Sequence, residues 1–160
     1  VNGTVPQETT NALYLAQLAY HFPSSGKIDV PVGMIPGVVA EMPVAGGICG
    51  GMTTSLWFDR GEAVMEFILP PEIAGVSPEA MQLFIKSDAS TLVNLKVELF
   101  AWESEAWQTL GNVRAGFNQL TNPQTWISTG GLVRLRLSRE NDFQGGGCYY
   151  AGLGLTGQRP

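Results

Sequence analysis

An alternation of apolar and polar residues, repeated along the second half of the chain, constrains the fold most. In VNLKVELFAW, residues 93–102, every second position is apolar: Val93, Leu95, Val97, Leu99 and Ala101. A period of two residues is that of a strand with one buried face. The same period returns in GLVRLRLS (131–138) and in CYYAGLGLTG (148–157). Each such strand needs an apolar partner layer.

Further strand signals precede and separate these three. TSLWFD (54–59) and EAVMEFILPP (62–71) flank Arg60 and Gly61, which suggests a tight hairpin, and MQLFIKSD (81–88) follows. Shorter strands are expected at residues 106–110, at 113–117 and around Trp126. Seven to nine short strands with turn signals between them predict an all-β fold, a two-sheet antiparallel sandwich of jelly-roll type. A closed barrel is the alternative.

The first half of the chain is less regular. Residues 1–26 form an N-terminal arm or short helix, with 11–22 read as helix although alternation gives a strand reading. Residues 27–160 then form a single β-sandwich domain. Prolines and glycines between 27 and 51 predict edge strands and loops. We expect the apolar residues between 13 and 44 to be surplus to the sandwich, forming contacts with it or with a neighbour.

The chain has two cysteines, Cys49 and Cys148, each within a glycine-rich stretch. Because glycines allow the close backbone approach that a disulfide needs, we predict a bridge between them. A bridge indicates an oxidising compartment, so the predicted location is extracellular or at the cell surface. The alternative is a pair of unpaired cysteines in the core.

Charge excludes several classes of partner. Charged residues are only 14% of the chain and the formal net charge is −5, which disfavours nucleic acids and anionic membranes. No apolar run is long enough to suggest membrane insertion. Two cysteines and one histidine lack the spacing of a zinc site, and the acidic residues of predicted loops lack that of a calcium loop. We therefore predict neither metal nor cofactor.

Catalytic signals are weak. His21 is the sole histidine and stands between two aromatic residues, so it makes a poor general base. Glu103 and Glu105 fall in a predicted hairpin turn, and Glu62 and Glu66 in a strand where both can face water. No nucleophile or phosphate-binding motif accompanies them. The chain is predicted not to be an enzyme.

Aromatic and arginine side chains are the candidate binding residues. Trp102 and Trp107 flank the WESEAW turn and Trp126 follows later, so they either pack across strands or stack on sugar rings. Arg134 and Arg136 share the polar face of one strand. They either clamp a ligand carboxylate or pair with Glu98 or Glu66 on neighbouring strands.

Several segments together resemble a known family. FILPPEIAG, VELFAWESEAWQTL, TWISTGGLVRLRLS and YYAGLGLTG, between about Glu62 and Gly157, are similar in patterning to discoidin-like or galactose-binding-like accessory domains of bacterial surface proteins. The resemblance implies a jelly-roll fold, non-catalytic binding or spacing, and attachment to a larger polypeptide. It does not cover the residues before Gly51.

The sequence thus predicts a non-catalytic extracellular module for adhesion or for assembly of a cell-surface structure. Its expected partner is another protein chain or a neighbouring domain, a second copy of itself included. The alternative is a carbohydrate-binding module that uses its tryptophans on a glycan.

Overall fold

The computed structural model describes residues 24–49, 54–87, 95–139 and 148–160. These residues form ten strands and two short helical turns. The strands are β1 (Gly26–Val30), β2 (Gly37–Glu41), β3 (Ala45–Ile48), β4 (Ser55–Ile68), β5 (Ser77–Ser87), β6 (Leu95–Ala101), β7 (Ala106–Thr109), β8 (Gly116–Leu120), β9 (Leu132–Arg139) and β10 (Cys148–Arg159). Helix α2 (Pro71–Ala74) and the 3₁₀ turn η1 (Pro123–Trp126) complete the elements. The fold is all-β, as predicted.

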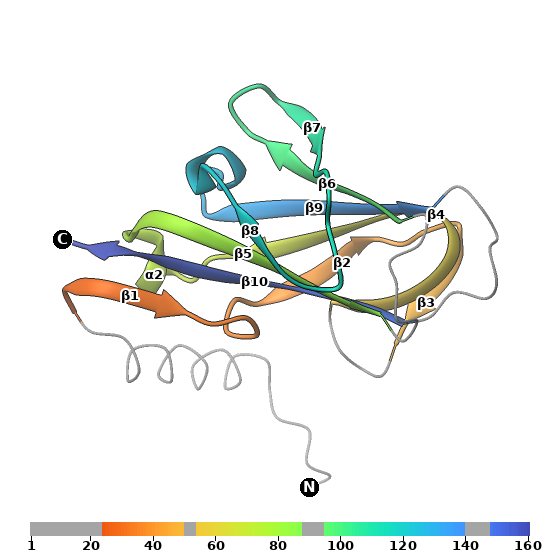
Figure 1. The fold of residues 1–160 in the computed structure, drawn as a ribbon, viewed down its shortest axis with the longest axis horizontal. Coiled ribbons are helices and arrows are strands. Elements are labelled where there is room, and N and C mark those ends of the chain that lie inside the picture. Colours follow the sequence, from red (N-terminus) through yellow and green to blue (C-terminus); the bar gives the residue numbers. More distant parts are fainter. Residues whose placement is uncertain (1–23, 50–53, 88–94, 140–147) are drawn as a thin grey trace, which may run out of the picture.

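The strands pair antiparallel in one continuous sheet. Their order is β7-β6-β9-β4-β10-β5-β8, with β1 beside β10 and with β2 and β3 beside β4. The sheet curls into a half-barrel (Figure 1). Strand β4 connects the halves, because its first residues pair with β10 and its last with β9.

The predicted hairpin at Arg60 and Gly61 is wrong. Residues 55–68 form one long strand, and the chain passes through Gly61 without reversing. Gly61 has a φ of 104°, which an L side chain rarely adopts, and a Cβ there would lie 3.1 Å from the backbone nitrogen of Val44. Glycine therefore permits an irregularity within a strand here, not a turn between two strands.

The apolar side chains at every second position of the alternating strands lie in the core. Val97 and Leu99 of β6, Leu135 of β9 and Leu153 of β10 are at most 2% exposed. Burying each such side chain stabilises the fold by about 1.5–3 kcal/mol. The alternation predicted these buried faces correctly.

The N-terminal half contributes to the same core. Val30 and Ile35 are buried, whereas Val38, Met42 and Val44 are exposed. Of the two alternatives for these apolar residues, contact with the sandwich or with a neighbour, Val30 and Ile35 take the first, and they do so within the core itself and not as a surplus layer. The predicted helix at 11–22, and most of the arm at 1–26, lie outside the described residues.

Two further local predictions have opposite outcomes. Cys49 and Cys148 form a disulfide across a sequence separation of 99 residues, as expected. It joins the residue after β3 to the first residue of β10. The strand expected around Trp126 is instead the turn η1, because Pro123 begins a short helical turn and Trp126 packs into the core.

Candidate functional site

Five predicted or neighbouring side chains gather on the outer face of β6, β7 and β9. We call this group the arginine–tryptophan surface; it consists of Phe100, Trp102, Trp107, Arg134 and Arg136. These positions alternate with buried residues of the same strands, so the strand period directs them away from the core. Cross-strand pairing sets Phe100 opposite Trp107.

The aromatic rings of this surface form an edge-to-face cluster. The Phe100 ring centroid lies 4.8 Å from that of Trp102 and 5.3 Å from that of Trp107, with interplanar angles of 76° and 72°. Such pairs contribute about 0.5–1.5 kcal/mol each beyond the area they bury. The Trp102 Nε1–H donates to the carbonyl oxygen of Trp126 at 3.1 Å, which fixes the orientation of the Trp102 ring.

Both arginines lie over these rings. The guanidinium carbon of Arg136 is 4.5 Å from the Trp107 centroid, and that of Arg134 is 5.5 Å from it. Arg134 also lies 5.8 Å from the Phe100 centroid. Cation–π contacts of this kind hold a guanidinium flat against a ring and restrict its motion.

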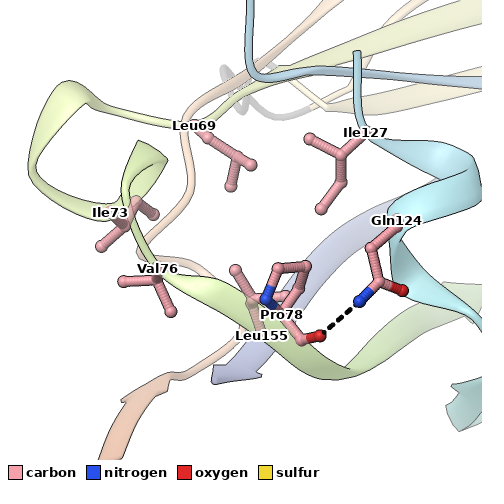
Figure 2. Close-up of a pocket in the computed structure, with 7 residues that line it drawn as sticks. All are labelled: Leu69, Ile73, Val76, Pro78, Gln124, Ile127 and Leu155. Atoms are coloured by element: carbon pink, nitrogen blue, oxygen red, sulfur yellow. Dashed lines mark hydrogen bonds between the residues drawn. The ribbon is translucent and has the colours of Figure 1, made fainter. Parts of the chain in front are cut away.

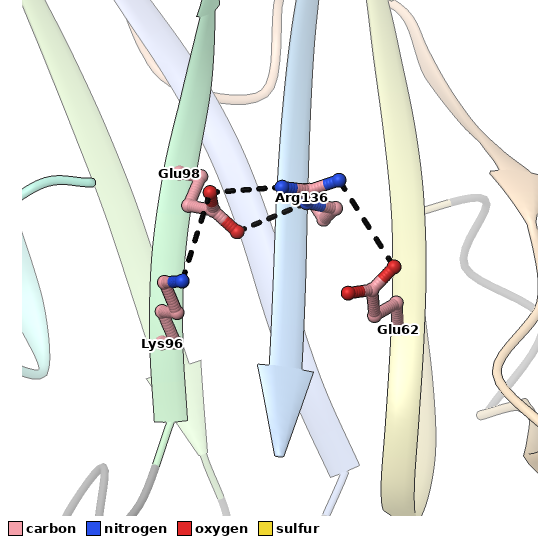
Figure 3. Close-up of polar contacts among 4 residues, drawn as sticks. All are labelled: Glu62, Lys96, Glu98 and Arg136. Carbon is pink, nitrogen blue, oxygen red and sulfur yellow. Dashed lines mark hydrogen bonds and ion pairs between the residues drawn. The ribbon is translucent and has the colours of Figure 1, made fainter. Parts of the chain in front are cut away.

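Arg136 is neutralised by carboxylates of neighbouring strands (Figure 3). Its Nε and Nη2 donate to Oε1 and Oε2 of Glu98, both at 2.9 Å, in a two-pronged ion pair. Glu62 approaches Arg136 at 4.0 Å, and the Lys96 amino group lies 3.9 Å from Glu98. Of the partners considered from sequence, Glu98 is therefore the one that binds Arg136.

This ion pair shifts the proton equilibria of both groups. The hydrogen bonds from Arg136 lower the pKa of Glu98, and burial offsets that effect only in part. The same hydrogen bonds raise the pKa of Arg136. Glu98 is only 4% exposed, so its charge depends on Arg136, and the pair holds β6 to β9.

Arg134 is in a different situation two residues earlier on β9. No carboxylate forms an ion pair with it within the described part of the chain, although Glu66 is its cross-strand partner on β4. Its Nε–H is buried and has no hydrogen-bond partner there. Among the residues that the structure describes, Arg134 is therefore a half-buried guanidinium that is positioned by aromatic rings and not neutralised by an ion pair.

The family described as "Domain of unknown function (DUF8815)" matches residues 29–157. The chain belongs to the DUF8815 family. The match begins within β1, ends within β10 and includes both cysteines and the whole arginine–tryptophan surface. Among curated proteins, none matches this DUF8815 domain.

The structure separates the tryptophans that the sequence grouped together. Trp102 and Trp107 are half-buried on the arginine–tryptophan surface. Trp126 is buried, and its Nε1–H donates to the carbonyl oxygen of Thr121 at 3.1 Å, so it is not part of a sugar-stacking platform. The structure therefore brings together Trp102, Trp107, Arg134 and Arg136. Trp126 contributes only its carbonyl oxygen, which accepts the hydrogen bond from Trp102.

Sequence reasoning missed two aromatic residues that matter for the surface of the DUF8815 domain. Phe100 is central to the aromatic cluster. It was detectable because the two-residue period places it on the same face of the strand as Lys96 and Glu98. Trp57 is 42% exposed on β4, and no local signal distinguishes its position from a core one.

An apolar pocket of about 170 Å³ lies where η1 approaches α2 and the start of β5 (Figure 2). Gln124 is its one polar side chain, and its Nε2 already donates to the carbonyl oxygen of Pro78 at 3.0 Å. A pocket of about 210 Å³ lies between β7 and β8; the amide of Asn118 in its wall is occupied by backbone partners. Neither lining includes an acid or a base, so neither pocket is suited to proton transfer.

The described ranges contain no group of three or more histidine, cysteine or carboxylate side chains placed to hold a metal ion. No helix in those ranges is long and apolar enough to cross a membrane.

Proposed function

We propose that this DUF8815 domain is a non-catalytic extracellular module for adhesion or for assembly of a cell-surface structure. Its arginine–tryptophan surface contacts another protein chain. The observation that carries the proposal is Arg134, whose guanidinium lies over the rings of Phe100 and Trp107 without an ion-pair partner in the described chain. A carboxylate from a partner would complete it.

The composition of the surface supports a protein partner. Tryptophan and arginine are enriched among the residues that dominate protein–protein binding energy. The rings are already fixed by one another and by the Trp102 hydrogen bond, so little side-chain entropy would be lost on binding. The face is part of a sheet, which suits a flat contact.

The location and the finer fold belong to the same proposal. The disulfide supports an oxidising compartment, because such bridges are rare in the cytosol. We also propose that the domain is a jelly-roll sandwich of the discoidin-like kind. The curled sheet supports this, since buried side chains of its strands form one hydrophobic core cluster.

Adhesion of protein-coated beads tests the proposal. Beads that carry the oxidised domain are applied to cells that produce it, and bound beads are counted. We expect Trp107→Ala combined with Arg134→Gln to reduce binding severalfold, and Arg114→Gln, an exposed arginine outside the surface, to leave it unchanged. Equal binding by all three proteins would contradict the proposal.

A carbohydrate-binding function is the second candidate. The observation in its favour is that Trp107 is partly exposed beside Arg134, an arrangement in which a ring can stack on a sugar and a guanidinium can bind its hydroxyls. A glycan array probed with the wild type and with Trp107→Ala separates the two functions. Glycan signals that disappear with Trp107→Ala favour this candidate over a protein partner.

A further inference from the structure

We propose that two copies of this chain pair about a two-fold axis through the arginine–tryptophan surface. In the pair, Arg134 of each copy receives the carboxylates of Glu103 and Glu105 of the other. This inference rests on the proposed assembly function and names the partner as a second copy of the chain. It uses three charged residues, Arg134, Glu103 and Glu105, that form no ion pair within the described part of the chain.

Glu103 and Glu105 provide the complementary charge. Both lie in the turn between β6 and β7, both are exposed, and neither forms an ion pair within the described segments. Glu105 has a φ of 53°, so it holds a tight turn, and the Ser104 hydroxyl donates to the carbonyl oxygen of Ala101 at 3.5 Å. The two carboxylates therefore project from a defined hairpin end.

Neither carboxylate forms an ion pair with Arg134 of its own chain within the described residues. Leu99 pairs with Leu135, so Arg134 lies level with Phe100. Ala101 pairs with Ala106, so the chain turns back over residues 102–105, with Glu103 in the turn and Glu105 at the start of the return towards β7. Strand β9 begins at Leu132, level with Trp102, so the turn reaches beyond the start of β9, where a second molecule can meet its carboxylates.

A two-fold arrangement satisfies both charges at once. In an isologous contact, residue i of one copy meets residue j of the other, and j meets i. A two-fold axis about midway between Arg134 and the hairpin end, near Trp102, would set each Arg134 opposite the partner's turn. The aromatic cluster would then lie at the centre, where a contact gains most from excluding water.

Apolar residues on the same face extend this contact. Ile68 of β4 pairs with Leu132 of β9, next to the row of Trp102, and is 51% exposed. Val38 of β2 pairs with Glu66 and is 46% exposed. Ile68 follows the buried Phe67 on β4, and Val38 follows the buried Gly37 on β2, so both side chains lie on the outer side and border the arginine–tryptophan surface on the side away from the hairpin.

Charge complementarity favours this face for self-association. The chain has a formal net charge of −5, so two copies repel each other at long range unless the contact brings unlike charges together. Arg136 is already neutralised by Glu98 and Glu62 and offers no free charge. Arg134 and the two turn glutamates are opposite charges within one self-complementary patch.

Sedimentation velocity on the full oxidised chain tests the pairing. The wild type is expected to show a monomer–dimer equilibrium that weakens with salt. Arg134→Glu and the double variant Glu103→Arg/Glu105→Arg should each weaken dimerisation roughly tenfold or more, because each sets like charges against each other. Arg114→Glu is the matched control and should not change the dimer.

An equimolar mixture of the two variants gives the decisive result. In the heterodimer, the carboxylate introduced by Arg134→Glu would meet the arginines introduced into the partner's turn, and the native Arg134 of the double variant would meet native glutamates. Attraction is thereby regained at both contacts. Restored association supports the pairing, and a mixture that remains monomeric overturns it. If Arg134→Glu loses its native near-ultraviolet circular dichroism, Arg134→Gln replaces it, and unchanged dimerisation of that folded variant also overturns the pairing.

The bead assay distinguishes this failure from that of the proposed function. A wild type that stays monomeric while its adhesion depends on Trp107 and Arg134 overturns self-pairing only, and the surface then has a different protein partner. If the wild type is monomeric and its adhesion does not change when Trp107 and Arg134 are substituted, both the self-pairing and the proposed function are overturned.

Discussion

Strands β9 and β10 have the same two-residue sequence period, but different kinds of residue occupy their outer faces. LVRLRLS in β9 and AGLGLTG in β10 both place leucines inward, and the buried Leu135 and Leu153 confirm that phase. The outer positions differ: they are Arg134 and Arg136 in β9 and Gly152 and Gly154 in β10. One strand therefore presents charge, and the other presents bare backbone.

The glycine face is covered by the chain itself. A Cβ at Gly152 would lie 2.7 Å from the Cγ1 of Val32, and one at Gly154 would lie 3.3 Å from the carbonyl oxygen of Val30. The segment after β1 thus crosses β10 at a distance that only glycine allows. Across β9, arginines and aromatic rings occupy the equivalent level. In these two strands, the outer face is covered by the chain where every second residue is glycine, and it carries half-buried side chains where every second residue is arginine.

Of the substitutions that test this comparison, removal of the disulfide should have the largest effect on stability. Cys49→Ala/Cys148→Ala is expected to lower the free energy of unfolding by about 4 kcal/mol, because the bridge closes a long loop in the unfolded chain. Urea denaturation of the variant and the wild type measures it. A loss below about 1 kcal/mol would mean that the start of β10 is held by its strand pairing alone.

A methyl group on the glycine face should destabilise the fold next most. Gly152→Ala is expected to cost about 2 kcal/mol by overpacking against Val32. Val32→Ala in the same chain should recover part of that loss, which a double-mutant cycle would report as a coupling energy. Additive effects of the two substitutions would show that Val32 does not cover Gly152.

On the arginine face, the ion pair and not the packing should determine stability. Glu98→Gln is expected to cost about 2 kcal/mol near neutral pH, since it weakens the two hydrogen bonds from Arg136. Because Arg136 lowers the pKa of folded Glu98, this advantage of the wild type is complete above the unfolded pKa of about 4.3. It should shrink as the pH falls through the lower folded pKa.

Denaturation curves of both proteins between neutral and acidic pH measure this convergence. Lys96→Gln is the control, because its amino group contacts the same carboxylate while the Lys96 side chain is 55% exposed. A difference between wild type and Glu98→Gln that stays constant into strong acid would contradict the assigned pKa direction.

Arg134→Gln should have the smallest effect on stability, within about 0.5 kcal/mol. Its guanidinium has ring contacts but no ion pair to lose in the described chain. Thermal unfolding measured at a concentration where the wild type is monomeric checks this. A loss comparable with that of Glu98→Gln would show that Arg134 is a structural residue like Arg136.

The strand period predicted much of the fold. It located β5, β6, β9 and β10 and their buried faces, because burial of alternate residues is a local property of a strand. It failed at Gly61, where a glycine within a strand and a glycine within a turn have the same local signature. It also failed at Trp126, whose environment is set by residues distant in sequence.

The candidate site was predicted only in part, for a related reason. Trp102, Trp107, Arg134 and Arg136 were named from residue type, and Glu98 was one of two partners considered for the arginines. Their roles differ because of strand register, which sets Arg136 opposite Glu98 and places Arg134 level with Phe100. Register depends on pairing between strands that are distant in sequence, so no local pattern reveals it.

The sequence by itself therefore determined the all-β class, the faces of the alternating strands and the disulfide, because hydrophobic period and cysteine count are properties of the chain. Only the tertiary structure decided that β4 continues through Gly61, that Val32 covers the glycines of β10, and that Arg136 pairs with Glu98 while Arg134 forms no ion pair within the described residues. Those outcomes depend on which distant segments pack against one another, and the free energy of such contacts exists only once the sheet has formed.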